Sequence, residues 1–227
     1  VDSAAEVPVA GGKIPFWARD ILHERDLDKI AEAVRLAELA TEGEIVPMIV
    51  RRSSVASYLP FQITLVMLVL ILVLEVPQAE FFAQFNAYWV LFFLSAFCYG
   101  CSVLLSRWQI LQRLFIPVPD QLFQVEARAR LEFYLQGLNR TEKSTGVLLF
   151  ISLMERRAVV LADQAIAQKL PKDTWLQVCH MMVDGVKKGQ TGEGFANAIR
   201  KCGEHLTQHF PIQPGDVDEL SNQLILK

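Results

Sequence analysis

Two long runs without a charged residue constrain this chain more than any other feature. Residues 53–74 hold 22 uncharged residues and residues 81–106 hold 26. A helix needs roughly 20 mostly apolar residues to cross a lipid bilayer. The pattern therefore predicts a transmembrane helical hairpin with spans at about 58–76 and 85–106. The alternative is two buried helices of a soluble core, but a chain of 227 residues is too short to surround them.

The residues that flank the two runs predict an orientation. The connection at 75–80 contains two acids and no Lys or Arg, whereas basic residues stand at the outer ends of both runs. Basic ends remain in the cytoplasm, so we expect an integral membrane protein whose remaining residues form a cytoplasmic domain. The predicted interface anchors are Arg51, Arg52, Tyr88, Trp89, Arg107 and Trp108.

Composition excludes two broad classes of protein. Hydrophobic residues make up 52% of the chain and charged residues 21%, which excludes a disordered chain. The net charge of -3 gives no basic field for nucleic-acid phosphates.

The four cysteines show no metal-ligand spacing, and we expect reduced structural thiols.

A hairpin returns the chain to the side on which it began, so the sequence on both sides of it is expected to form one domain. We divide the chain into an N-terminal extension (1–15), a first domain part (16–55), the hairpin (56–108) and a second domain part with a tail (109–227). Helical patterns occupy 27–40, 120–138, 172–187 and 192–209, and apolar runs typical of strands occupy 44–51, 147–153 and 158–162. The runs at 147–153 and 158–162 predict a β-hairpin, and the run at 224–226 predicts an edge strand. Alternating helices and strands indicate an α/β sandwich. Because Pro47 has no N–H, its strand is expected at an edge or with a bulge.

Four stretches together resemble the TPM-domain family. They are Asp-Leu-Asp-Lys-Ile (26–30) through Thr-Glu-Gly-Glu-Ile-Val-Pro (41–47), Arg-Ala-Arg-Leu-Glu-Phe (128–133) through Thr-Gly (145–146), Ile-Ser-Leu-Met-Glu-Arg-Arg (151–157) followed by Ala-Asp (162–163), and His-Phe-Pro (209–211) with Asp-Glu-Leu (218–220). The resemblance implies a TPM-like α/β/α sandwich, here in a bacterial inner-membrane branch with an inserted hairpin. It also implies either acid phosphatase activity, sometimes with bound calcium, or a role in maintaining membrane complexes.

Acids and arginines at strand ends are the candidate metal or anion site: Glu44, Glu155, Arg156, Arg157 and Asp163. If these positions converge, their carboxylates suit a hard cation such as Ca²⁺ or Mg²⁺. The structural alternatives are a solvated turn for residues 155–157, a helix N-cap for Asp163, and an ion pair or a cap for Glu44.

Other motifs carry little chemistry. His205 and His209 share a helical face, but the Glu of the H-E-x-x-H metalloprotease pattern is missing, and a helix C-terminus favours His for electrostatic reasons. Phosphate-binding loops, dinucleotide motifs and a nucleophile elbow are all absent from the sequence.

The sequence supports two hypotheses of function. The first is a scaffold or auxiliary protein that binds partners in a membrane complex, in contact with the lipid bilayer. The second is a Ca²⁺- or Mg²⁺-dependent phosphatase at the membrane surface. The sequence shows no recognisable nucleophile and favours the first; it does not indicate an oligomeric state.

Overall fold

The computed structural model describes residues 14–54, 59–73, 87–105, 117–214 and 219–227, and all structural statements below concern these residues. They divide into two compact units, residues 1–53 with 122–227, and residues 54–121. The first unit holds the sheet, and the second holds the two apolar helices.

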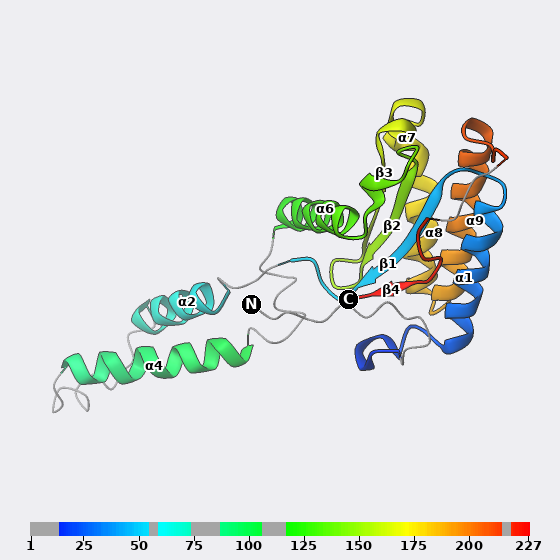
Figure 1. Ribbon diagram of the computed structural model, residues 1–227. Coiled ribbons are helices and arrows are strands. Elements are labelled where there is room, and N and C mark those ends of the chain that lie inside the picture. Colours follow the sequence, from blue (N-terminus) through cyan, green and yellow to red (C-terminus); the bar gives the residue numbers. More distant parts are fainter. Residues whose placement is uncertain (1–13, 55–58, 74–86, 106–116, 215–218) are drawn as a thin grey trace. The chain divides into compact units, whose positions relative to one another are not determined.

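A four-stranded sheet with the order β3-β2-β1-β4 forms the centre of the first unit (Figure 1). Strands β1 (Glu44–Val50) and β2 (Gly146–Ser152) run parallel, with Glu44 beside Gly146 and Val50 beside Ser152. Strand β3 (Arg157–Ala162) returns antiparallel to β2, and the two-residue β4 (Ile225–Leu226) adds to β1 in parallel. The β-hairpin predicted at 147–162 and the edge strand predicted at 224–226 are therefore confirmed.

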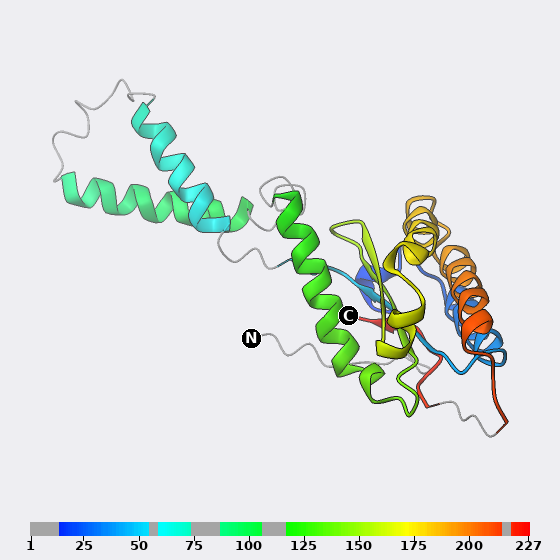
Figure 2. The same cartoon turned by 90° about the horizontal axis from the view of Figure 1, so that it is seen from above.

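Helices cover both faces of the sheet (Figure 2). On one face lie α1 (Glu24–Glu38), α8 (Leu176–Lys187) and α9 (Thr191–His209), and on the other lies α6 (Val118–Leu135). Alternation along β1 and β2 creates two cores, because successive side chains of a strand point to opposite faces. Ile45, Ile49 and Leu149 pack toward the three helices, whereas Met48 and Phe150 pack toward α6. The predicted α/β sandwich is confirmed.

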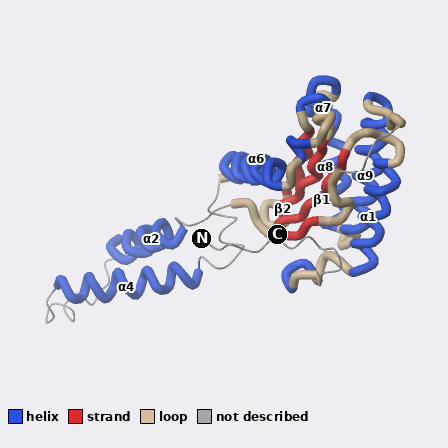
Figure 3. Tube along the Cα trace, in the orientation of Figure 1, coloured by secondary structure: helices blue, strands red, loops and turns tan. Residues whose placement is uncertain are grey.

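The connecting elements are short. They are η1 (Phe16–Ala18), η2 (Leu138–Arg140), α7 (Gln164–Lys169) and η3 (Lys172–Trp175), and Figure 3 shows the loops that join them to the layers. Helices α8 and α9 approach closely at two glycines, where a Cβ on Gly185 would lie 2.6 Å from the Cα of Gly194.

The prediction that Pro47 places its strand at an edge or in a bulge is wrong, because β1 has neighbours on both sides. Hydrogen bonds explain why the proline is tolerated. The carbonyl of Ile49 and the N–H of Arg51 hydrogen-bond to the backbone of Lys227 on the β4 side. Pro47 lies two residues before Ile49, so its backbone nitrogen faces the same side. Pairing with β4 begins only at Met48, so no β4 carbonyl lies opposite the missing N–H.

The second unit contains α2 (Leu59–Val73) and α4 (Ala87–Leu105), which pack against each other. The hydroxyls of Thr64 and Ser102 hydrogen-bond at 2.7 Å, and the rings of Phe61 and Tyr99 lie 5.7 Å apart. Ile63 and Cys98 are buried between the helices.

The membrane prediction is corrected by these helices. Among the described residues, none of the helices combines the length and the apolar character that a bilayer span requires. Helix α2 has 15 residues, about 22 Å at 1.5 Å per residue, against a hydrocarbon core of about 30 Å. This finding contradicts the expected integral inner-membrane protein with a cytoplasmic domain. The outer parts of the predicted spans, at 58, 74–76, 85–86 and 106, lie outside the described residues, as do the predicted anchors Arg107 and Trp108.

Candidate functional site

The five predicted site residues lie at two opposite ends of the central strand pair. Glu44 begins β1 and pairs with Gly146 at the start of β2. Asp163 lies at the same end, because its N–H donates to the carbonyl of Gly146 at 2.8 Å. Glu155, Arg156 and Arg157 follow the other end of β2. Six residues of strand separate the ends by about 20 Å. The structure therefore does not bring the five side chains together.

Glu44 holds the segment that leads into β4. The residue is 5% exposed, and its carboxylate accepts hydrogen bonds from the backbone N–H groups of Glu219 and Leu220, both at 3.3 Å. A buried carboxylate needs such donors. The capping interpretation of Glu44 agrees with this geometry.

Asp163 is the N-cap of α7, which confirms the structural interpretation of this residue. Its carboxylate accepts the N–H of Gln164 at 2.7 Å. An N-cap satisfies one of the free donors at the start of a helix.

Glu155 is the centre of a buried polar cluster and not a solvated turn residue. It is 3% exposed, and it accepts the hydroxyl of Ser152 and the backbone N–H of Ser53, the latter at 3.3 Å. Ser53 donates its own hydroxyl to Ser152 at 2.9 Å. This cluster fixes the turn after β2 to the chain that leaves β1. Arg51 and Arg52 follow β1 and are exposed.

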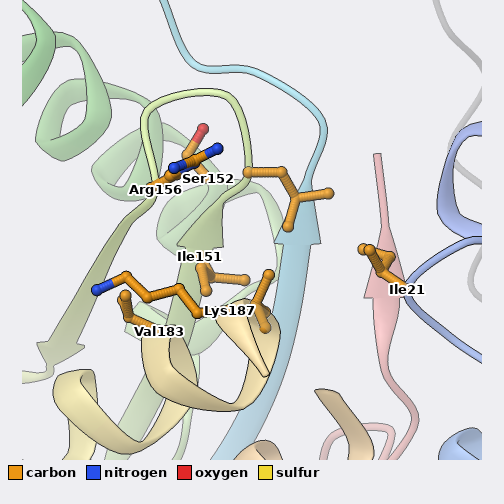
Figure 4. A pocket seen from close by; sticks show the side chains of 8 residues that line it. Ile21, Ile151, Ser152, Arg156, Val183 and Lys187 are labelled. Atoms are coloured by element: carbon orange, nitrogen blue, oxygen red, sulfur yellow. The ribbon is translucent and has the colours of Figure 1, made fainter. Parts of the chain in front are cut away.

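Arg156 and Arg157 are exposed in the turn and at the start of β3, as a solvated turn predicts. Arg156 has a left-handed backbone with φ of 53°, which is uncommon for residues other than glycine. Its side chain lines a cavity of about 330 Å³ together with residues from β2, α8 and the loop before α1 (Figure 4). The lining residues are Ile21, Ile151, Ser152, Leu153, Arg156, Val183, Val186 and Lys187.

Sequence reasoning missed most of this cavity. Ile21, Val183 and Lys187 reach it from segments far apart in the chain, and each fits an ordinary helical or loop pattern. Only the proximity of Arg156 to a strand end pointed toward it.

The two cysteines of the α/β domain, Cys179 and Cys202, are poor nucleophiles. Burial raises the pKa of Cys179 to about 11, and burial also raises the pKa of Cys202. A thiol with a raised pKa holds little of the reactive thiolate at neutral pH.

The two histidines near the end of α9 are His205 and His209. His205 packs edge-on against the ring of Trp175, with centroids 6.2 Å apart, and burial and the nearby Lys201 lower its pKa. Within the described ranges, no group of three or more His, Cys, Asp or Glu side chains is placed to hold a metal ion. His209 is the last residue of α9, where a helix C-terminus favours a basic side chain.

The chain is similar to known proteins both in sequence and in fold. The fold defines an α/β sandwich, and the family model described as the TPM domain matches residues 118–205, from the start of α6 into α9. No curated protein matches the chain. Among solved structures, the NMR structure of the BA42 protein from the psychrophilic bacterium Bizionia argentinensis is similar, with 18% identity and a TM-score of 0.57. The match covers 92% of this chain and 97% of that one, and at this identity it shows the fold alone.

Proposed function

We propose that this protein is an auxiliary or scaffold protein with a TPM-like domain, which binds a protein partner through the apolar helices α2 and α4. One observation carries the proposal: most large side chains described on these two helices remain exposed. We define the docking surface as those that are at least half exposed: Phe61, Leu65, Val66, Val69, Leu70, Trp89, Phe92, Phe93, Phe97 and Leu104.

The packing of α2 on α4 leaves this surface uncovered. The helices use Ile63, Cys98 and Ser102 against each other, and these side chains are at most 7% exposed. Phe97 is 68% exposed and Leu65 is 63% exposed. Exposed apolar patches of this extent mark sites of interaction with another molecule.

The chemistry of the surface favours a protein as the partner. Trp89 lies within 6.2 Å of both Phe92 and Phe93, centroid to centroid. Clustered Trp and Phe side chains are typical of the centres of protein interfaces, where they contribute most of the binding energy. The described residues of α2 and α4 carry no charge, so the partner is expected to present an uncharged, apolar surface, such as that of a membrane-complex subunit.

The α/β domain supports a binding role more than a phosphatase. Two of its candidate carboxylates, Glu44 and Glu155, accept hydrogen bonds from the chain itself, at opposite ends of β1 and β2. Phosphoryl transfer needs cations, donors and a nucleophile around one reacting atom. No observation on the described residues favours the metal-dependent phosphatase, and binding of Ca²⁺ or Mg²⁺ remains a prediction of the resemblance.

A pair of charged variants tests the proposal. We would tag the full chain in its native host and measure the native mass of its complexes, with Leu65→Glu and Phe97→Glu combined. The matched control combines Leu39→Glu and Leu176→Glu, which are 59% and 57% exposed on the α/β domain. The proposal expects a discrete heavier species that contains a second protein, lost in the first variant and kept in the control. Equal behaviour of both variants would contradict it, and so would association with lipid alone.

A further inference from the structure

The cavity beside Arg156 has the position of a ligand site. It is lined by the last residues of β2, the turn after it and the last turns of α8 (Figure 4). Ligands of open α/β sheets bind in the crevice beyond the carboxyl ends of the strands. Its volume of about 330 Å³ falls within the range of small-molecule sites, and it belongs entirely to the α/β domain.

The walls and the rim of the cavity differ in chemistry. Aliphatic side chains from three segments form the walls: Ile21, Ile151, Leu153, Val183 and Val186. Two cations, Arg156 and Lys187, and the hydroxyl-bearing Ser152 complete the lining, and no carboxylate is part of it. A ligand with an apolar hydrocarbon part and one anionic group matches this lining.

The two cations are available to a ligand. Within the described residues, no carboxylate forms an ion pair with Arg156. Lys187 lies 3.8 Å from Asp184, but both side chains are more than half exposed, and such a pair is weak. Ser152 already donates its hydroxyl to Glu155. Arg156 and Lys187 are therefore the hydrogen-bond donors that the cavity offers.

The backbone of Arg156 adds an independent observation. A φ of 53° costs free energy for any residue with a Cβ, and glycine would adopt it without strain. The backbone conformation of the turn therefore suits glycine better than arginine. The side chain is one of those that line the cavity, and this gives a reason for arginine there.

We propose that this cavity binds a small aliphatic carboxylate, with the carboxylate on Arg156 and Lys187 and the hydrocarbon part against the aliphatic walls. The planar guanidinium matches a carboxylate in a two-bond geometry, and the ammonium adds a second charge. A free short-chain acid and the apolar C-terminus of a polypeptide present the same chemistry. The proposal does not depend on the docking surface of α2 and α4.

Titration calorimetry on the full chain tests it with five probes: hexanoate, acetate, hexylammonium, hexyl phosphate and an acetylated tripeptide that ends in leucine. We expect hexanoate to bind more tightly than acetate, by about fourfold for each methylene buried, and hexylammonium not to bind. The better of hexanoate and the tripeptide identifies the source of the carboxylate. Tighter binding of hexyl phosphate, equal binding of hexylammonium or no binding at all would overturn the proposal.

Variants locate the site. Arg156→Gln and Lys187→Gln are expected to weaken hexanoate binding at least tenfold, whereas the neighbours Arg157→Gln and Lys188→Gln, which do not line the cavity, are expected to leave it unchanged. Arg156→Gly separates binding from folding. It should keep or raise the melting temperature and still abolish binding. Equal affinity in Arg156→Gly and the parent chain would overturn the assignment.

Discussion

The ammonium group of Lys227 lies 2.7 Å from the carboxylate of Glu132, and this contact ties the residue after β4 to helix α6. Arg128 reaches the other oxygen of the same carboxylate, also at 2.7 Å. The Glu132 side chain is only 1% exposed, so the helix on one face of the sheet is bound to the sheet edge through a buried charge.

Removal of that charge should destabilise the domain. We expect Glu132→Gln to lower the free energy of unfolding by about 2–4 kcal/mol, because it leaves Lys227 largely buried without its anion. Urea unfolding followed by circular dichroism measures the change. Glu126→Gln on the same helix breaks an exposed pair with Arg130 and should cost less than about 1 kcal/mol. Equal losses in the two variants would contradict the role given to Glu132.

A methyl group at Gly185 should separate α8 from α9. Its Cβ would lie 2.6 Å from the Cα of Gly194, so the helices must shift, and we expect Gly185→Ala to cost about 1–3 kcal/mol. Asp184→Ala, at the exposed neighbouring position, should change stability by less than about 0.5 kcal/mol. Thermal unfolding of both variants checks the packing, and an unchanged Gly185→Ala would contradict the close approach.

The raised pKa of Cys179 predicts a loss of stability at alkaline pH. The pKa rises from 9.0 to about 11 through burial, so the thiol stays protonated in the folded chain while the unfolded chain ionises. This contribution is fully present below pH 9 and is lost as pH rises to 11, up to about 2–3 kcal/mol. Urea unfolding at pH 8 and pH 10.5 measures it. Cys179→Ala should show a smaller loss over this interval, and an equal loss in the variant would contradict the assignment.

The distance between the predicted metal-site carboxylates implies that divalent cations have little effect on the melting temperature. Because Glu44 and Glu155 lie at opposite ends of β1 and β2, millimolar Ca²⁺ or Mg²⁺ should shift the melting temperature by less than about 1 °C. A site built from these carboxylates would raise it by several degrees at saturation. Such a rise, removed by Glu44→Gln, would support the phosphatase alternative.

Periodicity predicted most of the α/β domain because each element buries one face or both. Helices 120–138 and 192–209 and the hairpin at 147–162 agree with α6, α9 and the pair β2 and β3 within a few residues. Pro47 misled because its tolerance depends on where β4 begins to pair, which only the three-dimensional register shows.

The site was harder to predict for a related reason. Glu44 is the first residue of one strand and Glu155 follows the last residue of another, and in a parallel pair these positions lie at opposite ends of the strands. Treating both simply as strand ends hid that difference. The cavity combines Ile21, Arg156 and Lys187, whose proximity follows from packing and from no local pattern.

The most direct test of the proposed function is photo-crosslinking in the native host, from a benzoylphenylalanine placed at Phe97 and, as a control, at Leu39. The side chains of both positions are exposed, at 68% and 59%, but only Phe97 belongs to the docking surface. We predict one discrete adduct with another protein from Phe97 and none from Leu39. Adducts with lipid alone, or the same adducts from both positions, would contradict a protein partner on α2 and α4.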